Sequence, residues 1–326
     1  KALSSGANNT VMGCGAGEVM TSGSCNVIIG KDAMGHCDVT GSNNVAIGCM
    51  AGRKVTGGNN NTFLGQYAGG GLTTGCSNFI VGLSAGSGTL TGVHNILLGD
   101  CAGKRITSGT KNIAIGLNAM REGNPVTGSY NVIFGANAGC KLTSGNNNVA
   151  VGAYAGRKNQ TGTGNVHLGP NAGCNNQGSG NIMIGQESGR GIGGHDNNIF
   201  IGKYAACAQS QGSCNIAIGC HVCLAICSGT GSSNQLAIGV GGDRWIVGNC
   251  DYNVGIGTTN PSSRLSVAGD ACFTGVATAT DFDSTSDIRL KTNIKPIDDP
   301  VSKVIQIEGV SFNWKKDDRP ALGVIA

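Results

Sequence analysis

One five-residue phrase, an asparagine followed by three mostly apolar residues and a glycine, recurs through the first two thirds of the chain. Neighbouring copies are 16 to 19 residues apart and most are 17 apart. A repeat this regular is typical of a solenoid, in which each repeat forms one coil and stacks on the next. The sequence therefore predicts an all-β, parallel β-solenoid (a β-roll or β-helix) of about 13 coils. The copies begin at Asn9, Asn26, Asn44, Asn61, Asn78, Asn95, Asn112, Asn131, Asn148, Asn165, Asn181, Asn198 and Asn215.

Composition fits stacked coils better than a thick globular core. Glycine occupies 58 of the 326 positions, and aromatic residues make up only 4% of the chain. Hydrophobic residues still reach 39% and recur in phase, which argues against disorder. A small-residue corner such as Ala51-Gly52 follows most copies of the phrase, and glycine permits the positive φ of a sharp corner. We expect a second short extended piece, ending at Val55 in this coil, before the next repeat begins.

Several classes of function find no support in the sequence. The net charge is +4 with charged residues at 12%, and no basic run interleaves with aromatics, so we expect no nucleic-acid partner. No apolar stretch approaches the ~20 residues of a membrane span, which predicts no membrane insertion. The 15 cysteines do not form a zinc-type pattern, and no glycine-rich loop lies in a βαβ context, so we expect neither a metal nor a cofactor.

The strand of each coil is apolar on both faces. Residues one and three after the asparagine lie on one face, as in Val45 and Ile47, and residue two lies on the other. We expect positions one and three to fill the coil interior. The middle residue would then face outward, where it would pack against identical faces in two further chains of a homotrimer. The expected trimer interface comprises Ile28, Ala46, Phe63, Ile80, Leu97, Ile133, Met183 and Phe200.

Two polar features interrupt this pattern. The recurring asparagines are expected to stack as a ladder at one corner of the coils, with a structural role. His167 is the one polar residue at the middle position of a strand. On a threefold axis, three copies of His167 would form a candidate axial site for an anion, a water or a metal ion. A histidine paired with its neighbours is the alternative.

The period changes after Asn215. Similar phrases begin at Gln235, Arg244 and Asn253, which are 9 residues apart, so single strands joined by hairpin turns should replace full coils. We therefore divide the chain into a solenoid shaft (1–233), an irregular β transition (234–260), a neck (261–285) and a C-terminal segment (286–326).

Two resemblances bear on the shaft and the neck. The phrase Asn43 to Gly48 is similar to the repeat of trimeric autotransporter adhesin heads, which implies a trimeric parallel β-roll. The segment VGIGTTNPSSRLSVAG, from Val254 to Gly269, resembles a recurring phrase near the ends of phage tail fibres.

The C-terminal segment carries the most specific resemblance. SDIRLKTNIKPI, from Ser286 onward, and the later GVSFNWK resemble the start of the intramolecular chaperone domain of phage tail spikes, tail fibres and endosialidases. That domain drives trimer assembly and then cleaves itself off. The resemblance implies that Ser286 is the nucleophile, Lys291 its activating base and Thr285-Ser286 the cleaved bond. The expected activity is one self-cleavage, without turnover of a substrate. The family domain continues further, so 286–326 would be its N-terminal part.

These features together predict a structural, homotrimeric phage or viral tail fibre that serves host-surface attachment. Its partners would be two further copies of the chain, a host receptor or glycan, and other tail proteins, and its location the virion or an extracellular surface. A cellular trimeric surface adhesin is the first alternative. A carbohydrate-degrading tail spike is the second, but acidic residues are sparse in the repeats and most such hydrolases need a carboxylate pair.

Overall fold

A computed structural model describes residues 5–88, 90–122, 125–206, 212–224, 233–278, 292–313 and 320–324. The chain divides into two compact units, Lys1–Ala271 and Cys272–Ala326, which are described here one at a time.

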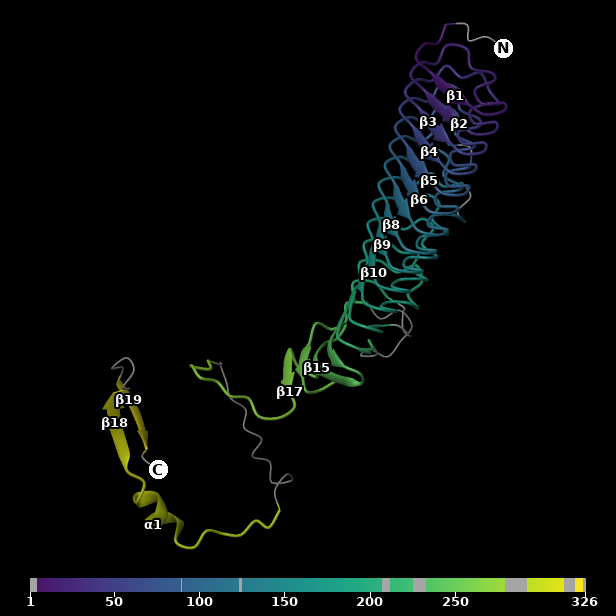
Figure 1. The fold of residues 1–326 in the computed structure, drawn as a ribbon. Coiled ribbons are helices and arrows are strands. Elements are labelled where there is room, and N and C mark those ends of the chain that lie inside the picture. Colours follow the sequence, from purple (N-terminus) through teal and green to yellow (C-terminus); the bar gives the residue numbers. More distant parts are fainter. Residues whose placement is uncertain are drawn as a thin grey trace. The chain divides into compact units, whose positions relative to one another are not determined.

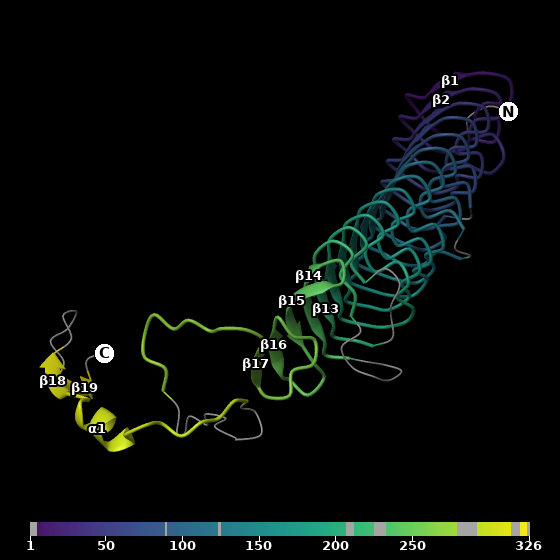
Figure 2. The ribbon, with the colours of Figure 1, turned by 90° about the horizontal axis from the view of Figure 1, so that it is seen from below.

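The first unit is mainly a stack of coils, and each coil contains one three-residue strand (Figure 1). Consecutive strands from β1 to β13 pair in parallel, so that each residue lies beside its counterpart in the next repeat, as in Val45 beside Thr62. Figure 2 shows the coils from a second direction. The predicted parallel β-solenoid is therefore confirmed. The strands are β1 (Thr10–Met12), β2 (Val27–Ile29), β3 (Val45–Ile47), β4 (Thr62–Leu64), β5 (Phe79–Val81), β6 (Ile96–Leu98), β7 (Ile113–Ile115), β8 (Val132–Phe134), β9 (Val149–Val151), β10 (Val166–Leu168), β11 (Ile182–Ile184), β12 (Ile199–Ile201) and β13 (Ile216–Ile218).

Glycine makes the corner that directly follows each strand. Gly48 has a φ of +135°, a region that favours glycine. A Cβ on Gly48 would also lie 2.6 Å from the carbonyl oxygen of Gly65 in the next coil. The expected second extended piece is mostly irregular: outside the named strands, the described residues form isolated parallel bridges at Met20–Val39 and Ile106–Val126.

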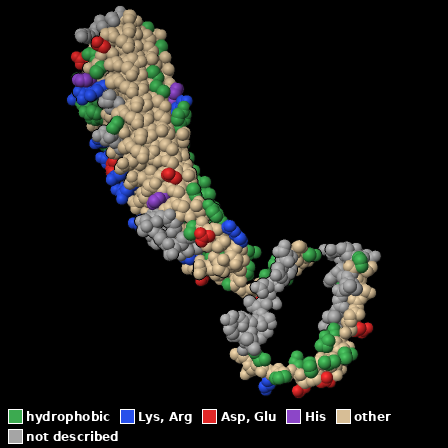
Figure 3. Space-filling view, turned by 180° about the vertical axis from the view of Figure 1, so that it is seen from behind, with side chains coloured by type: hydrophobic (Ala, Val, Ile, Leu, Met, Phe, Trp, Pro, Cys, Tyr) green, Lys and Arg blue, Asp and Glu red, His purple; other side chains and the backbone are tan. Residues whose placement is uncertain are grey.

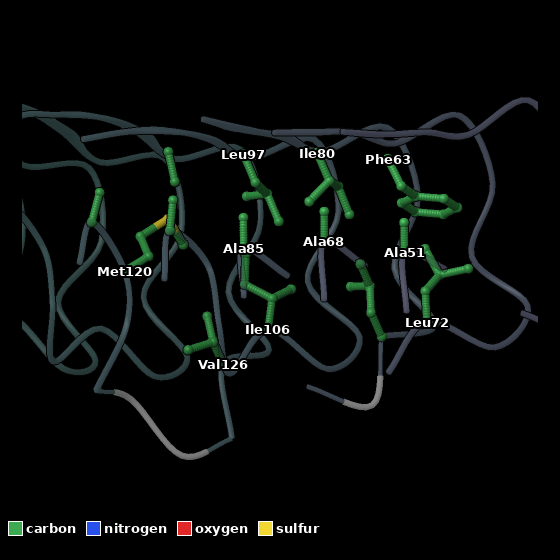
Figure 4. Packing of buried hydrophobic residues seen from close by; sticks show 14 of the residues in the cluster. Ala51, Phe63, Ala68, Leu72, Ile80, Ala85, Leu97, Ile106, Met120 and Val126 are labelled. Atoms are coloured by element: carbon green, nitrogen blue, oxygen red, sulfur yellow. The ribbon is translucent and has the colours of Figure 1, made fainter. Parts of the chain in front are cut away.

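The core of the stack is thin: in each coil, one large side chain from the strand meets one from the opposite wall. Middle strand residues such as Phe63 and Leu97 point inward and are fully buried. Figure 4 shows them facing Leu72 and Ile106 from the opposite wall, with alanines such as Ala85 beside them. Alanine and glycine leave room for the large middle side chains: a Cβ on Gly69 would overlap the Phe63 ring.

The predicted orientation of the strands is wrong, because the middle residues face the interior and positions one and three face outward. The eight residues assigned to a trimer interface are at most 1% exposed within a single chain. They are therefore core residues and cannot contact another chain. Alternation alone cannot tell inside from outside when both faces are apolar. The direction in which each coil closes decides it, and that depends on the corner glycines and on the opposite wall. The corrected residues are Ile28, Ala46, Phe63, Ile80, Leu97, Ile133, Met183 and Phe200.

The stack ends in a meander, as the shortened spacing predicts. Strand β14 (Leu236–Val240) continues the parallel sheet, and β15 (Asp243–Gly248) and β16 (Val254–Ile256) then pair in antiparallel fashion. Strand β17 (Leu265–Val267) adds to β16 in parallel.

The second unit contains one short helix and one hairpin among its described residues. Helix α1 (Pro300–Ile305) begins at Asp299, whose carboxylate accepts a hydrogen bond from the Ser302 amide at 3.3 Å. Strands β18 (Gly309–Asn313) and β19 (Pro320–Val324) form an antiparallel pair. No described helix in either unit is long and apolar enough to cross a lipid bilayer.

Candidate functional site

The outward-facing residues of the sheet form a continuous apolar surface. We call this surface the outer face, and it consists of positions one and three of strands β2 to β13. Thr62 is the single polar residue among these 24 positions. Eleven steps at the ~4.8 Å spacing of β-strands make the outer face roughly 50 Å long. Its residues are only partly covered in one chain, with Phe79 at 42% and Phe134 at 51% exposure.

The contiguous apolar surface of the outer face is larger than the apolar patches that a monomeric soluble protein normally exposes. Single exposed apolar residues are ordinary, but a contiguous patch of this size usually marks a contact with another molecule. Figure 3 shows hydrophobic side chains following one edge of the stack. The sequence identified an apolar second face correctly. It assigned the wrong residues to that face.

The recurring asparagines form the predicted ladder. From Asn26 to Asn198, the Nδ2 of each ladder asparagine donates to the Oδ1 of the preceding one, as from Asn95 to Asn78 at 3.0 Å. The same Nδ2 donates to a glycine carbonyl, Gly109 in this coil, at 3.0 Å. The Asn95 Oδ1 in turn accepts from both the backbone amide and the Nδ2 of Asn112. Both amide hydrogens and both lone pairs are therefore used, and the ladder is a structural element without free polar groups.

His167 lies at the middle position of β10 and is buried inside the single chain. Its Nε2 is 3.0 Å from the Nδ2 of Asn176. The Oδ1 of Asn176 accepts a hydrogen bond from the Gly178 amide, which orients the Asn176 Nδ2 as a donor to the histidine. Nε2 is then the acceptor, and the ring proton resides on Nδ1, which has no partner among the described residues.

The expected axial ion site at His167 is wrong for the same reason as the expected interface. The ring is enclosed by its own coil and the coil before, against Gly156 and Gly173, and does not face another chain. Burial lowers the pKa of His167 from 6.5 to about 4, so the ring is neutral at pH 7. Among the described residues, no group of three or more His, Cys, Asp or Glu side chains could hold a metal ion.

The residues predicted for self-cleavage, Ser286 and Lys291, lie outside the described residues. The described part of this segment exposes most of its apolar side chains. In α1 no residue is buried, and Val304 and Ile305 are 65% and 77% exposed. Ile297, which precedes the helix, is 63% exposed. This unit therefore has little core of its own among its described residues.

Comparison with known proteins identifies one segment of the chain. Residues 286–326 match the family described as chaperone of endosialidase. The match begins at the serine that the sequence resemblance assigns as nucleophile, and it covers α1, β18 and β19. No curated protein and no solved structure matches the chain significantly. A β-solenoid joined to such a segment fits a tail-fibre or tail-spike type of protein.

Proposed function

We propose that this chain is the shaft and assembly segment of a homotrimeric tail fibre that serves attachment to a host surface. Three solenoids would pack side by side through their outer faces, with the C-terminal segment bringing the three chains into register. The function is structural, and its place would be the virion tail or another extracellular surface.

The outer face is the observation that carries the proposal. A sheet with two apolar faces is stable in water only when both faces are buried against other parts of the chain or against other chains. The inner face is covered by the coil itself, so the outer face needs other chains. Identical chains can cover it along its whole length, because every coil presents the same two positions at the same spacing. Obligate interfaces between identical chains are typically large and apolar in this way.

The C-terminal segment supports assembly as part of the function. It matches a chaperone family, and Val301, Val304 and Ile305 of its helix are exposed in one chain. A short helix with exposed apolar side chains is stabilised when those side chains pack against another part of its own chain or against other copies of the chain. This coupling would restrict the folded segment to correctly assembled trimers.

The mass in solution tests the proposed assembly. The purified chain should have about three times the 32.6 kDa mass of one chain. A compact monomer at micromolar concentration would overturn the proposal.

Self-cleavage is a separate part of the proposal and rests on the family match at Ser286. A serine hydroxyl needs a base, and a lysine serves as one when burial lowers its pKa. In the full-length protein, Ser286→Ala should therefore leave one uncleaved band on a denaturing gel where the parent gives two. Ser284→Ala provides the matched control and should cleave as the parent does. Identical fragments from the parent and Ser286→Ala would exclude this mechanism.

A further inference from the structure

Stacking gathers basic side chains that are scattered in the sequence. In four consecutive coils, positions nine and ten after the ladder asparagine lie at one corner, just after the alanine at position seven and the residue that follows it. Backbone hydrogen bonds hold these corners in register, as from the Lys141 amide to the Arg157 carbonyl at 3.1 Å. In the four consecutive coils that begin at Asn95, Asn112, Asn131 and Asn148, the corner carries six cations. These six residues, which we call the basic ridge, are Lys104, Arg105, Arg121, Lys141, Arg157 and Lys158.

The basic ridge is dense in charge and largely uncompensated. Three steps at the ~4.8 Å strand spacing place the six cations within roughly 14 Å along the stack. Glu122 is the single carboxylate at these positions in the four coils. None of the six forms an ion pair in the described part of the chain, where Arg190 and Glu187 form a salt bridge at 2.9 Å. Like charges this close repel one another, so the ridge favours a bound anion.

The basic ridge stays accessible when the outer face is covered. Positions nine and ten directly precede the residues of the wall opposite the strand, such as Ile106 and Leu142. Figure 4 shows Ile106 on the far side of the core from the strand residue Leu97. In Figure 3, Lys and Arg side chains gather along the edge opposite the main run of hydrophobic side chains. Each chain of a trimer would therefore present its own ridge to solvent.

We propose that the basic ridge binds an anionic polysaccharide laid along the stack. A linear chain with regularly spaced carboxylates or sulfates matches a linear column of cations. Tyr154 lies beside the ridge with 40% exposure, and the Arg157 guanidinium sits over its ring at 5.6 Å, so the ring is held in place for stacking against a sugar. Single-stranded nucleic acid is less well matched, because its binders stack successive bases on several aromatic rings in a groove. The proposal names a ligand class for the attachment function and rests on that function.

Two double charge reversals of equal net effect test the proposal. Arg105→Glu with Lys158→Glu removes two exposed cations from the ridge. Lys111→Glu with Lys203→Glu removes two exposed cations elsewhere on the stack and changes the net charge equally. Binding of a size-defined heparin oligosaccharide to the full chain would be measured by calorimetry at fixed salt, with neutral dextran and single-stranded DNA as comparison ligands.

We expect the parent to bind heparin and not dextran. The ridge variant should bind at least tenfold more weakly, and the control variant within twofold of the parent. Absence of heparin binding, equal weakening in both variants, or tighter binding of DNA than of heparin would each overturn the proposal. Circular dichroism and solution mass check that each variant is folded and assembled as the parent is, so that a change in affinity reports on binding alone. A trimeric parent that fails to bind heparin would overturn the ridge alone, whereas a monomeric parent would overturn the proposed function.

Discussion

The ladder asparagine of each repeat joins its coil to the coils before and after it. It is buried, as in Asn95, which donates twice to the asparagine before it and once to the Gly109 carbonyl, and which accepts twice from the asparagine after it. Removing one member therefore breaks contacts on both sides. Buried polar groups that lose their partners cost far more than an average hydrogen bond contributes.

Replacing one ladder asparagine should destabilise the stack strongly. Asn95→Ala leaves the amide and the Nδ2 of Asn112 without their acceptor, and we expect a loss of ~3 kcal/mol or more in the free energy of unfolding. Gln66→Ala, which removes an exposed side-chain amide, is the control and should change stability by less than ~0.5 kcal/mol. Thermal unfolding followed by circular dichroism would compare them, and equal midpoints would contradict the structural role of the ladder.

His167 should make the stack sensitive to acid. Its folded pKa of about 4 is below the ordinary 6.5, so the unfolded chain binds a proton more readily than the folded chain does. The free energy of unfolding is fully retained above pH 6.5 and decreases as the pH falls from 6.5 toward 4. The total effect is ~3 kcal/mol per chain. His167→Leu should remove this component, because leucine occupies the same position in β6 as Leu97.

The measurement is the unfolding midpoint of both proteins between pH 7 and 4.5. Carboxylates titrate alike in the two proteins, so their contribution cancels in the difference. We expect the difference between parent and variant to change with pH. A difference that stays constant over this range would show that His167 is not the titrating group.

At the scale of the element, each coil depends on the glycine that follows the strand. Gly99 has a φ of +123°, and a Cβ there would lie 2.8 Å from the Gly116 carbonyl. Backbone of the next coil cannot move aside without shifting the whole stack. The close approach of the coils thus requires glycine at this corner, and the recurrence of glycine in the sequence follows from it.

Gly99→Ala should therefore cost at least ~2 kcal/mol, from the positive φ and from the contact with the next coil. Gly193→Ala is the matched control, since nothing lies within 4 Å of its Cβ position and it has no positive φ. Chemical denaturation of both variants would compare them. Similar stability of the two variants would contradict the requirement for close stacking.

The strand period could be predicted from the sequence, but the direction of each side chain could not. Thirteen copies of the phrase fix the number and the spacing of the coils, and the halved spacing after Gln235 predicts the hairpins around β15. Val45, Ala46 and Ile47 are all apolar, so no polar residue indicates which face meets solvent. The burial of Ala46 and the outward position of Ile47 follow from how the coil closes, which is a property of the whole repeat.

The basic ridge, in contrast, could have been found from the sequence once the repeats were aligned. Lys104 and Lys158 are 54 residues apart in sequence, and only the register of the stack brings them to one corner. Counting residues from the ladder asparagine would have found the ridge. The overall charged fraction, which is low, concealed it.

At the scale of the whole molecule, two surfaces of the stack have different expected roles. The outer face is apolar and would be covered by two further chains. The basic ridge is charged and would remain in solvent. Substitutions on the outer face should therefore weaken assembly of the three chains. Substitutions of core residues should instead destabilise the coil within each chain.

The most direct test is the solution mass of a variant altered only on the outer face. Phe79→Asp with Ile96→Asp places two charges on that face and leaves the buried Ile80 and Leu97 unchanged. We predict that the parent is a trimer and that the variant is monomeric at the same concentration, with its β-sheet circular dichroism signal retained. A variant that remains trimeric, or a parent that is monomeric, would contradict assembly through the outer face.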